Sequence, residues 1–226
     1  MRLLIGIPAY NEEITIGKVV TSIPKKIKGI TRIDTVVVDD GSSDHTYQKA
    51  SKVGATVLQH LINRGLGGAL KTIFAYAREC NCDVLVTLDA DGQHDSGDIP
   101  KVIAPIFYSH ADVVIGTRWL TKSTAPLARK IINKLANVVT YVFFGVGTSD
   151  SQSGFRAFSK RAIGNLKLNA DGMEVSSEVF KEIKRNQLRY KEVTIIPVYT
   201  QYSQAKGQRI SNSINVFFQL LLRLLQ

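Results

Sequence analysis

The stretch Val84-Leu85-Val86-Thr87-Leu88-Asp89-Ala90-Asp91-Gly92-Gln93-His94 joins an apolar run directly to two carboxylates. Residues 84–88 are typical of a strand buried on both faces of a parallel sheet. Asp89 and Asp91 follow at the carboxyl end of that strand, where open α/β sheets bind ligands. Two carboxylates this close repel each other, and Mg²⁺ or Mn²⁺ relieves that repulsion because a hard dication prefers oxygen ligands. The same residues also form ordinary turns, so the pattern alone leaves a metal site and a simple turn as alternatives.

Strand-like and helix-like segments alternate on both sides of this stretch. We expect strands over residues 3–7, 34–38, 55–58, 84–88 and 112–116. We expect helices between them, over residues 12–22, 45–53, 66–79 and 99–108. This alternation predicts an α/β fold with a mainly parallel, twisted sheet flanked by helices.

The pattern changes after Arg118. Here we expect a long helix over residues 127–144, a short strand over 155–158, a helix over 174–185 and a strand over 193–198. From Ser211 the chain is apolar and amphipathic but too short to span a bilayer. We interpret residues 211–226 as a helix at a membrane interface or against a membrane partner, with docking on the core as the alternative.

Composition narrows the class of protein. The 226 residues suit one α/β domain, and the formal net charge of +10 suggests an anionic partner such as a phosphorylated substrate or an acidic membrane surface. A generally basic surface is the alternative. No usual nucleic-acid module is recognisable, so we expect no nucleic-acid partner. The N-terminus does not resemble a signal peptide, so we expect a cytoplasmic protein. Cys80 and Cys82 lack the second pair of ligands that a structural zinc site needs, so we expect both to be reduced thiols.

Three more polar loops follow predicted strands. They begin at Pro8, Asp39 and Asn63. Because parallel strands end at one edge of a sheet, these loops should meet the acidic loop in one crevice. There Tyr10 is suited to stacking on a base, and Asp39 or Asp40 to bonding a base or ribose. Gly65, Gly67 and Gly68 resemble a phosphate loop, or they simply permit close packing at the start of a helix.

These loops together resemble the family 2 glycosyltransferases, and most closely the dolichyl- or polyprenyl-phosphate mannose and glucose synthases. The residues that carry the likeness are Pro8-Ala9-Tyr10-Asn11-Glu12-Glu13, Asp39-Asp40-Gly41-Ser42, Asn63-Arg64-Gly65 and Asp89-Ala90-Asp91-Gly92-Gln93-His94. Gly116-Thr117-Arg118 and residues 151–158 extend it over most of residues 1–200. The resemblance implies a GT-A fold, a nucleotide-diphosphate sugar donor, a divalent metal (Mg²⁺ or Mn²⁺) and inversion at the anomeric carbon.

The resemblance also implies roles for single residues. Those that would bind the nucleotide sugar are Pro8, Ala9, Tyr10, Glu12, Asp39, Asp40, Arg64, Gly65, Asp89 and Ala90. Those that would serve the metal and diphosphate are Asp89, Asp91 and Gln93. The candidate catalytic residues are Asp91, Arg118 and Asp150. Those that would approach an acceptor phosphate are Arg118, Arg129, Lys206 and Arg209.

On this basis we expect a GT-A catalytic domain over residues 1–210. Residues 1–118 would form its nucleotide-sugar half and residues 119–210 its acceptor half, followed by the amphipathic helix over 211–226. The expected partners are a nucleotide-diphosphate sugar, a polyprenyl phosphate, and a membrane surface or a small membrane protein. The protein would then work in the cytoplasm or peripherally at the cytoplasmic face of a membrane.

The chemistry of the acceptor separates the remaining alternatives. A phosphate monoester is mostly dianionic near pH 7, so an undecaprenyl or dolichyl phosphate needs no strong general base. A hydroxyl of a lipid-linked or capsular polysaccharide does need one, usually a carboxylate, for which Asp150 and Glu174 are candidates. Asp150 equally suits a role in bracing a loop. A catalytically silent nucleotide-binding subunit is the alternative from another class.

Overall fold

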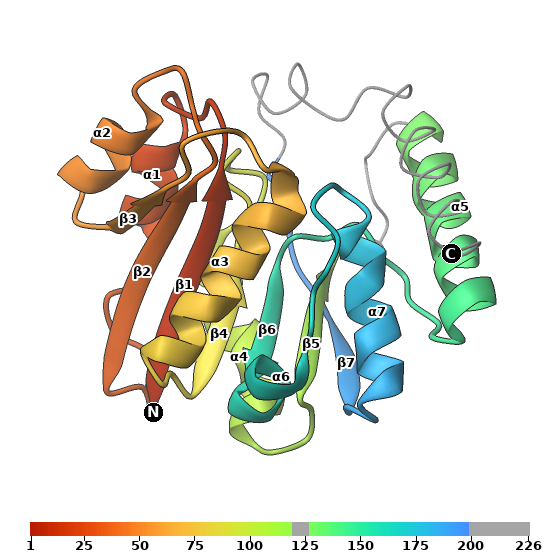
Figure 1. Ribbon diagram of the computed structural model, residues 1–226. Helices are drawn as coiled ribbons and strands as arrows, with labels where there is room; N and C mark the ends of the chain where they lie inside the picture. Colours follow the sequence, from red (N-terminus) through yellow and green to blue (C-terminus); the bar gives the residue numbers. More distant parts are fainter. Residues whose placement is uncertain (119–126, 199–226) are drawn as a thin grey trace.

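The computed structural model describes residues 1–118 and 127–198 (Figure 1). Within the helix α5 (Leu127–Phe144), the side chains of residues 127–132, 139 and 143 also lie outside this description. The described strands form one seven-stranded sheet in the order β3-β2-β1-β4-β6-β5-β7. Their bounds are β1 Arg2–Ala9, β2 Arg32–Asp39, β3 Thr56–Gln59, β4 Val84–Thr87, β5 Val113–Thr117, β6 Arg156–Ser159 and β7 Tyr190–Thr194.

Only β6 interrupts the parallel arrangement of the described strands. It pairs antiparallel with β4 on one side and with β5 on the other. The pairs β1–β2, β1–β4, β2–β3 and β5–β7 are parallel. The predicted mainly parallel sheet is therefore confirmed. Since β1 lies between β2 and β4, the strand order reverses there, and a crevice is expected at their carboxyl ends.

Helices cover both faces of the sheet (Figure 1). Their bounds are α1 Ile16–Ser22, α2 Thr46–Lys52, α3 Gly65–Glu79, α4 Ile99–Phe107, α6 Lys160–Asn165 and α7 Val175–Arg185, with a single 3₁₀ turn η1 at Ser96–Asp98. Strand β1 shows why two layers form: Leu3, Ile5 and Ile7 join the core under α1 and α4, whereas Leu4 joins the core under α3, α6 and α7. The period of two along the strand thus places apolar side chains in both cores.

Close packing of α3 on β1 depends on Gly6. A Cβ atom there would lie 2.4 Å from Cγ2 of Ile73, so α3 could not approach the sheet as it does. This contact sets the height of α3 above the strands, and therefore the position of the loop that leads into α3.

Most predicted elements are found within a residue or two of their expected ends, and α5 has the expected bounds. The helix predicted over residues 12–22 begins only at Ile16, because residues 10–15 form turns that bond to the loop after β2. Helix α6 was not expected. It begins at Lys160, directly after Ser159, whose hydroxyl accepts a hydrogen bond from the Ala162 amide as a helix cap.

The prediction of a strand over residues 193–198 is wrong in position. Strand β7 runs from Tyr190 to Thr194, because those five residues pair in register with Val113 to Thr117 of β5. The chain then leaves the sheet and crosses the acidic loop, where the Val198 amide donates to the Gln93 carbonyl at 2.9 Å and Pro197 pairs with His94. The residues that suggested a strand here therefore pair through their backbone with the loop after β4.

In the part of the chain that the structure describes, no helix is long and apolar enough to cross a membrane. The call for a helix over residues 211–226 lies outside the described residues. The nucleotide and acceptor halves expected for residues 1–118 and 119–210 contribute strands to the same sheet.

Candidate active site

The acidic loop begins directly after β4, at the centre of the sheet. Oδ2 of Asp89 lies 2.9 Å from Nε2 of His94, a ring whose side chain is 1% exposed. Asp91 accepts two hydrogen bonds from Gln93, one from the amide at 2.9 Å and one from Nε2 at 2.6 Å. Each carboxylate is thus oriented by a different neighbour within the loop.

The two carboxyl groups have opposite pKa shifts. Burial and the negative charge of Asp89 raise the pKa of Asp91 to about 6. Burial also opposes ionisation of Asp89, but the hydrogen bond and charge of His94, with the charges of Arg118 and Arg156, hold the pKa of Asp89 below its ordinary value. The loop therefore has one firmly ionised carboxylate and one that keeps its proton until the pH approaches neutrality.

This donor set fits a hard divalent cation. Asp89 and Asp91 offer carboxylate oxygens, and their mutual repulsion is what a dication relieves. Within the described residues, no group of three or more His, Cys, Asp or Glu side chains is arranged to hold a metal ion. A cation held by two carboxylates would leave coordination positions for the oxygens of a diphosphate, as is common for Mg²⁺ sites.

Gly154 brings the loop before β6 against Asp89. A Cβ atom on Gly154 would lie 2.0 Å from Oδ1 of Asp89 and 2.4 Å from its Cγ. Only glycine permits this approach without moving the carboxylate. Thr87 secures the same contact, because its hydroxyl donates to the Gly154 carbonyl at 2.8 Å.

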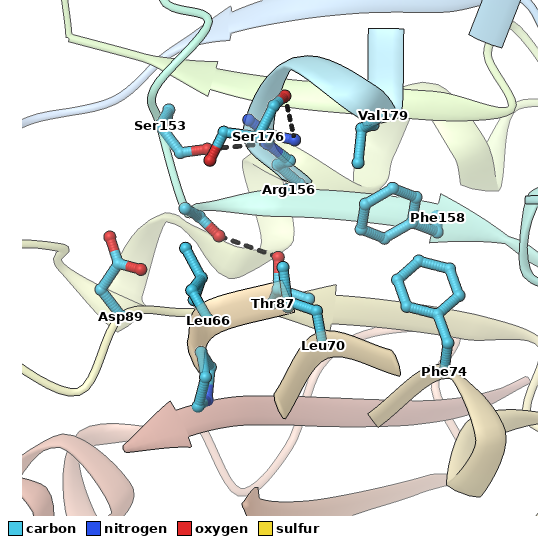
Figure 2. A pocket seen from close by; sticks show the side chains of 12 residues that line it. Leu66, Leu70, Phe74, Thr87, Asp89, Ser153, Arg156, Phe158, Ser176 and Val179 are labelled. Atoms are coloured by element: carbon cyan, nitrogen blue, oxygen red, sulfur yellow. Dashed lines mark hydrogen bonds between the residues drawn. The ribbon is translucent and has the colours of Figure 1, made fainter. Parts of the chain in front are cut away.

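A small cavity lies behind Asp89, with a volume of about 20 Å³, which is room for about one water molecule. Figure 2 shows its lining: Thr87, Ser153, Arg156 and Ser176 are polar, and Phe74, Phe158 and Val179 form the apolar end. Its size allows no sugar or base to enter, so it is an internal extension of the site and not the substrate crevice.

Sequence reasoning missed Arg156, although it lies in the motif that extends the family resemblance. Its buried guanidinium donates to three backbone carbonyls, those of Ser151 at 2.8 Å, Ser153 at 2.7 Å and Ser176 at 3.1 Å. Burial lowers the pKa of Arg156 to about 10, while Asp150 and Asp89 favour its charge. Arg156 is thus a cation beneath the acidic loop, and a lone Arg in an apolar strand was the available signal.

The loop after β2 carries Asp39 and Asp40, both buried. Asp39 accepts from the Ser42 amide at 3.0 Å and from Nε2 of Gln59 at 3.1 Å. Asp40 accepts from the amides of Arg64 and Gly65 at 2.9 and 2.8 Å, and lies 2.6 Å from Nδ1 of His60. Asp40 therefore holds the 63–65 loop against the end of β2.

The glycines at the start of α3 serve close packing, which was one of the two alternatives. The carbonyl of Asp171 accepts hydrogen bonds from the amides of Gly67 at 2.7 Å and Gly68 at 3.2 Å. A Cβ atom on Gly67 would lie 2.1 Å from the carbonyl oxygen of Ala170. The comparison with a phosphate loop is wrong for these two amides, because they are already bonded within the protein.

The loop after β1 lies at the same edge of the sheet. Ala9 pairs in register with Asp39, and Pro8 lines the cavity behind Asp89. Tyr10 is 46% exposed, whereas Glu12 is buried, its amide donating to Oγ1 of Thr46 at 2.7 Å. Ala90 is buried within the acidic loop, and Arg64 is exposed beside Asp40.

Arg118 and Asp150 form a two-pronged ion pair at the end of β5. Nε and one terminal nitrogen of Arg118 donate to the two carboxylate oxygens of Asp150 at 2.8 and 2.9 Å, and the Arg118 amide adds a bond of 3.2 Å. The Asp150 side chain is fully buried, whereas the Arg118 side chain is 17% exposed. This geometry favours the bracing alternative for Asp150, because both of its oxygens hold the guanidinium.

Three side chains expected near an acceptor phosphate lie outside the described part of the chain. Arg129 belongs to α5, but its side chain is outside the described residues, as are Lys206 and Arg209. Glu174 lies at the start of α7, buried, with its Oε1 3.3 Å from the Gly172 amide.

The sheet, the acidic loop at its switch point and the sequence together define a class of enzyme. The family model for glycosyl transferase family 2 matches residues 4–166. The chain therefore belongs to glycosyl transferase family 2.

The chain is also similar over most of its length to several individual proteins. It is 40% identical to an uncharacterized protein of Methanocaldococcus jannaschii, covering 98% of this chain and 91% of that protein. It is 35% identical to the UDP-N-acetylglucosamine–dolichyl-phosphate N-acetylglucosaminyltransferase of Methanococcus voltae, covering 96% and 93%. The dolichol-phosphate mannosyltransferase of Pyrococcus furiosus is 31% identical over 92% of this chain and 58% of its own length.

The glucosyl-3-phosphoglycerate synthase of Mycobacterium tuberculosis, solved with Mn²⁺ and UDP-glucose, shares the fold with a TM-score of 0.77. The match covers 99% of this chain and 78% of that one at 21% identity. The fold is thus that of the GT-A glycosyltransferases, as the sequence predicted.

Proposed function

We propose that this protein is an inverting glycosyltransferase that moves a sugar from a UDP- or GDP-linked donor to a polyprenyl phosphate, either undecaprenyl or dolichyl phosphate. The observation that carries the proposal is the joint position of two charged pairs at one edge of the sheet. Asp89 and Asp91 follow β4, and Arg118, held by Asp150, follows β5. An acidic pair suits a cation with the donor diphosphate, and an oriented arginine suits an anionic acceptor or the departing diphosphate.

The relatives support an acceptor of this kind. Two of those described above are named for transfer to dolichyl or dolichol phosphate. The first of them covers nearly the whole of both chains, so the likeness includes the acceptor half of the sequence.

The contacts of Asp150 support a phosphate acceptor over a hydroxyl. A hydroxyl acceptor requires a carboxylate that takes a proton, but both oxygens of Asp150 hold Arg118 and the side chain is fully buried. A phosphate monoester arrives already deprotonated near pH 7, so its oxygen attacks the anomeric carbon without a base. Arg118 would then orient the acceptor phosphate or neutralise the departing nucleoside diphosphate.

Helix α5 supports a lipid acceptor. Its inward side carries Asn133 and Asn137, which bond the loop before β6, and its described outward side carries several apolar residues together with Lys134. The exposed apolar side chains of that outward face are Leu135, Val138, Tyr141 and Val142. An apolar stripe turned to solvent, on a helix whose other side contacts the segment that holds Arg118, suits an enzyme whose acceptor carries a long hydrocarbon tail. The same face would bring the enzyme to a membrane surface or to a small membrane protein.

A divalent cation, Mg²⁺ or Mn²⁺, would be held by Asp89 and Asp91 with Gln93 nearby, and would supply charge to the leaving diphosphate. The residues of the chain have their own tasks. His94 keeps Asp89 in place, Gln93 orients Asp91, and Arg156 maintains positive charge beneath the loop. Tyr10 and Asp39 would receive the base and ribose.

The proposal is tested with purified full-length protein, Mn²⁺ and a panel of radiolabelled UDP-, GDP- and dTDP-sugars. Undecaprenyl phosphate, dolichyl phosphate and a soluble glycan are offered as acceptors in parallel. We expect label in an organic-extractable glycolipid that depends on the lipid phosphate. Label only on a glycan hydroxyl would reject the lipid phosphate as acceptor, and no transfer despite nucleotide binding would favour a silent subunit.

A thermal-shift series identifies the nucleotide. UDP, GDP and dTDP are each added with and without Mn²⁺, because a ligand that binds only the native state raises the unfolding temperature. We expect one nucleotide to give the largest shift, and that shift to need the cation.

A further inference from the structure

The segment 148–151, between α5 and β6, is tied to the middle of β7 by one carboxylate. Glu192 accepts from the hydroxyl of Thr148 at 2.6 Å, from the amide of Ser149 at 2.7 Å and from the hydroxyl of Ser149 at 2.7 Å. Among the described residues, Glu192 makes no ion pair with Lys or Arg, so these donors compensate for its partial burial.

The same segment is fixed from two other directions. The Nδ2 groups of Asn133 and Asn137 on α5 donate to the Ser149 carbonyl at 2.8 and 2.7 Å. The Ser149 hydroxyl also lies 2.7 Å from Oγ1 of Thr117 at the end of β5. The amide, hydroxyl and carbonyl of Ser149 are therefore all bonded, to β7, β5 and α5.

Asp150 follows Ser149 directly and holds Arg118 through both carboxylate oxygens. Glu192 pairs in register with Ile115, three residues before Arg118 on the neighbouring strand. Thus β5 supplies the arginine, β7 supplies Glu192, and Ser149 lies between them. The direction of the guanidinium then depends on where Glu192 holds Ser149.

We propose that Glu192 is a positioning residue for sugar transfer: by holding Thr148 and Ser149, it fixes Asp150 so that Arg118 faces the acceptor phosphate or leaving diphosphate. The expected loss of transfer rate rests on the proposed function, whereas the expected effect of Glu192 on the position of Asp150 and Arg118 does not. Errors of about 1 Å in an aligning group cost up to about 100-fold in rate. Loss of Glu192 should therefore slow transfer and leave the nucleotide loops, on β1 and β2, unaffected.

The test compares Glu192→Ala and Glu192→Gln with Lys191→Ala, an exposed neighbour on β7, as the matched control. Glutamine keeps an acceptor oxygen for Thr148 and for the Ser149 amide, so it should preserve kcat within about threefold. Alanine should lower kcat by about 10- to 100-fold, with the affinity for Mn²⁺ and UDP unchanged. Lys191→Ala should have the kcat of the wild type and the same affinity for Mn²⁺ and UDP.

A double-mutant cycle tests whether Glu192 acts on the rate through Arg118. In an Arg118→Gln background, Glu192→Ala should cause little further loss of kcat, because the group that it positions is already gone. Full additivity of the two losses would overturn the proposal. A loss confined to the KM of the donor would also overturn it, since that would place Glu192 with the nucleotide loops.

An NMR measurement needs no turnover. The Nε–H of Arg118 bonds to a buried carboxylate and should exchange slowly with water in the wild type. Glu192→Ala should speed this exchange, and Glu192→Gln should not. If Glu192→Ala does not fold, Ser149→Ala, which removes the hydroxyl bonds to Glu192 and Thr117 but keeps the amide bond to Glu192, should show a smaller increase in exchange. Unchanged exchange in folded Glu192→Ala, or in folded Ser149→Ala where Glu192→Ala does not fold, would overturn the positioning role. Absence of transfer by the wild type would count only against the proposed function.

Discussion

Replacement of Asp91 by asparagine should stabilise the cation-free protein at neutral pH, although it removes a group expected to hold the cation. Asp91 is ionised at pH 8 only against its burial and the charge of Asp89, which raise its pKa from 3.8 to about 6. Asparagine removes that charge and keeps a carbonyl oxygen for the Gln93 amide, which donates to Asp91 at 2.9 Å.

The size and sign of the effect follow from proton linkage. Below pH 3.8 Asp91 is protonated in both the folded and the unfolded chain, so its ionisation does not lower the free energy of unfolding. Between pH 3.8 and about 6 the unfolded chain releases the proton while the folded chain keeps it, so stability falls as pH rises. Above pH 6 the cost is constant at about 3 kcal/mol, since a pKa change of one corresponds to about 1.4 kcal/mol. Partial exposure screens some of this repulsion.

The assay is urea unfolding of the wild type and Asp91→Asn in EDTA, from pH 4.5 to pH 8. The stability advantage of the variant should grow by about 1–2 kcal/mol over this range. Glu79→Gln, which neutralises an exposed carboxylate on α3, is the control for the loss of any negative charge. Saturating Mn²⁺ should reverse the order, because only the wild type gains binding energy.

An advantage of Asp91→Asn that does not change with pH would refute the reasoning, since it would show that Asp89 does not oppose ionisation of Asp91. A variant that stays more stable than the wild type in saturating Mn²⁺ would instead contradict the assignment of Asp91 to the cation.

Three other predictions concern separate parts of the site. Gly154→Ala should weaken Mn²⁺ binding at least about tenfold, because the added Cβ would displace Asp89. Gly164→Ala, whose Cβ would have no neighbour within 4 Å, is the control and should bind Mn²⁺ normally. Electron paramagnetic resonance measures the affinity of both variants, and normal affinity in folded Gly154→Ala would contradict the contact. Arg118→Lys should lower kcat about 10- to 100-fold, since lysine cannot make the two-pronged pair; activity near the wild type would show that only charge matters there. Deletion of residues 211–226 should reduce sedimentation with liposomes more than UDP affinity, and full sedimentation of the truncated protein would refute a membrane role for that segment.

The sequence was sufficient for the fold because the apolar runs have clear periods and ends. The five strands before Arg118 were predicted, and the acidic loop at the end of β4 follows from them. Strand β7 was placed too late in the sequence, because Ile195 and Ile196 are as apolar as residues of a strand. The end of the strand is decided instead by its register with β5. Periodicity carries no information on such pairing.

The contacts within the site were less accessible. Two contacts of the site join residues more than 30 positions apart: Arg118 pairs with Asp150, and Arg156 lies buried under Asp89. No local sequence pattern encodes contacts over such a separation. The glycines at the start of α3 looked like a phosphate loop, because a glycine that makes room for a ligand and a glycine that makes room for a neighbouring backbone are identical in sequence. Only the position of the Asp171 carbonyl distinguished the two.

The reversed direction of β6 has a consequence for how such a site changes over time. Because β6 runs against its neighbours, it enters the sheet at the edge where β4 and β5 leave it. The connection that precedes Gly154 therefore lies beside Asp89 and Asp91, and a change in its sequence requires no shift in the pairing of β1, β2 and β4. If the proposed function holds, a change of acceptor would alter this connection and leave the strands that carry the expected nucleotide loops as they are.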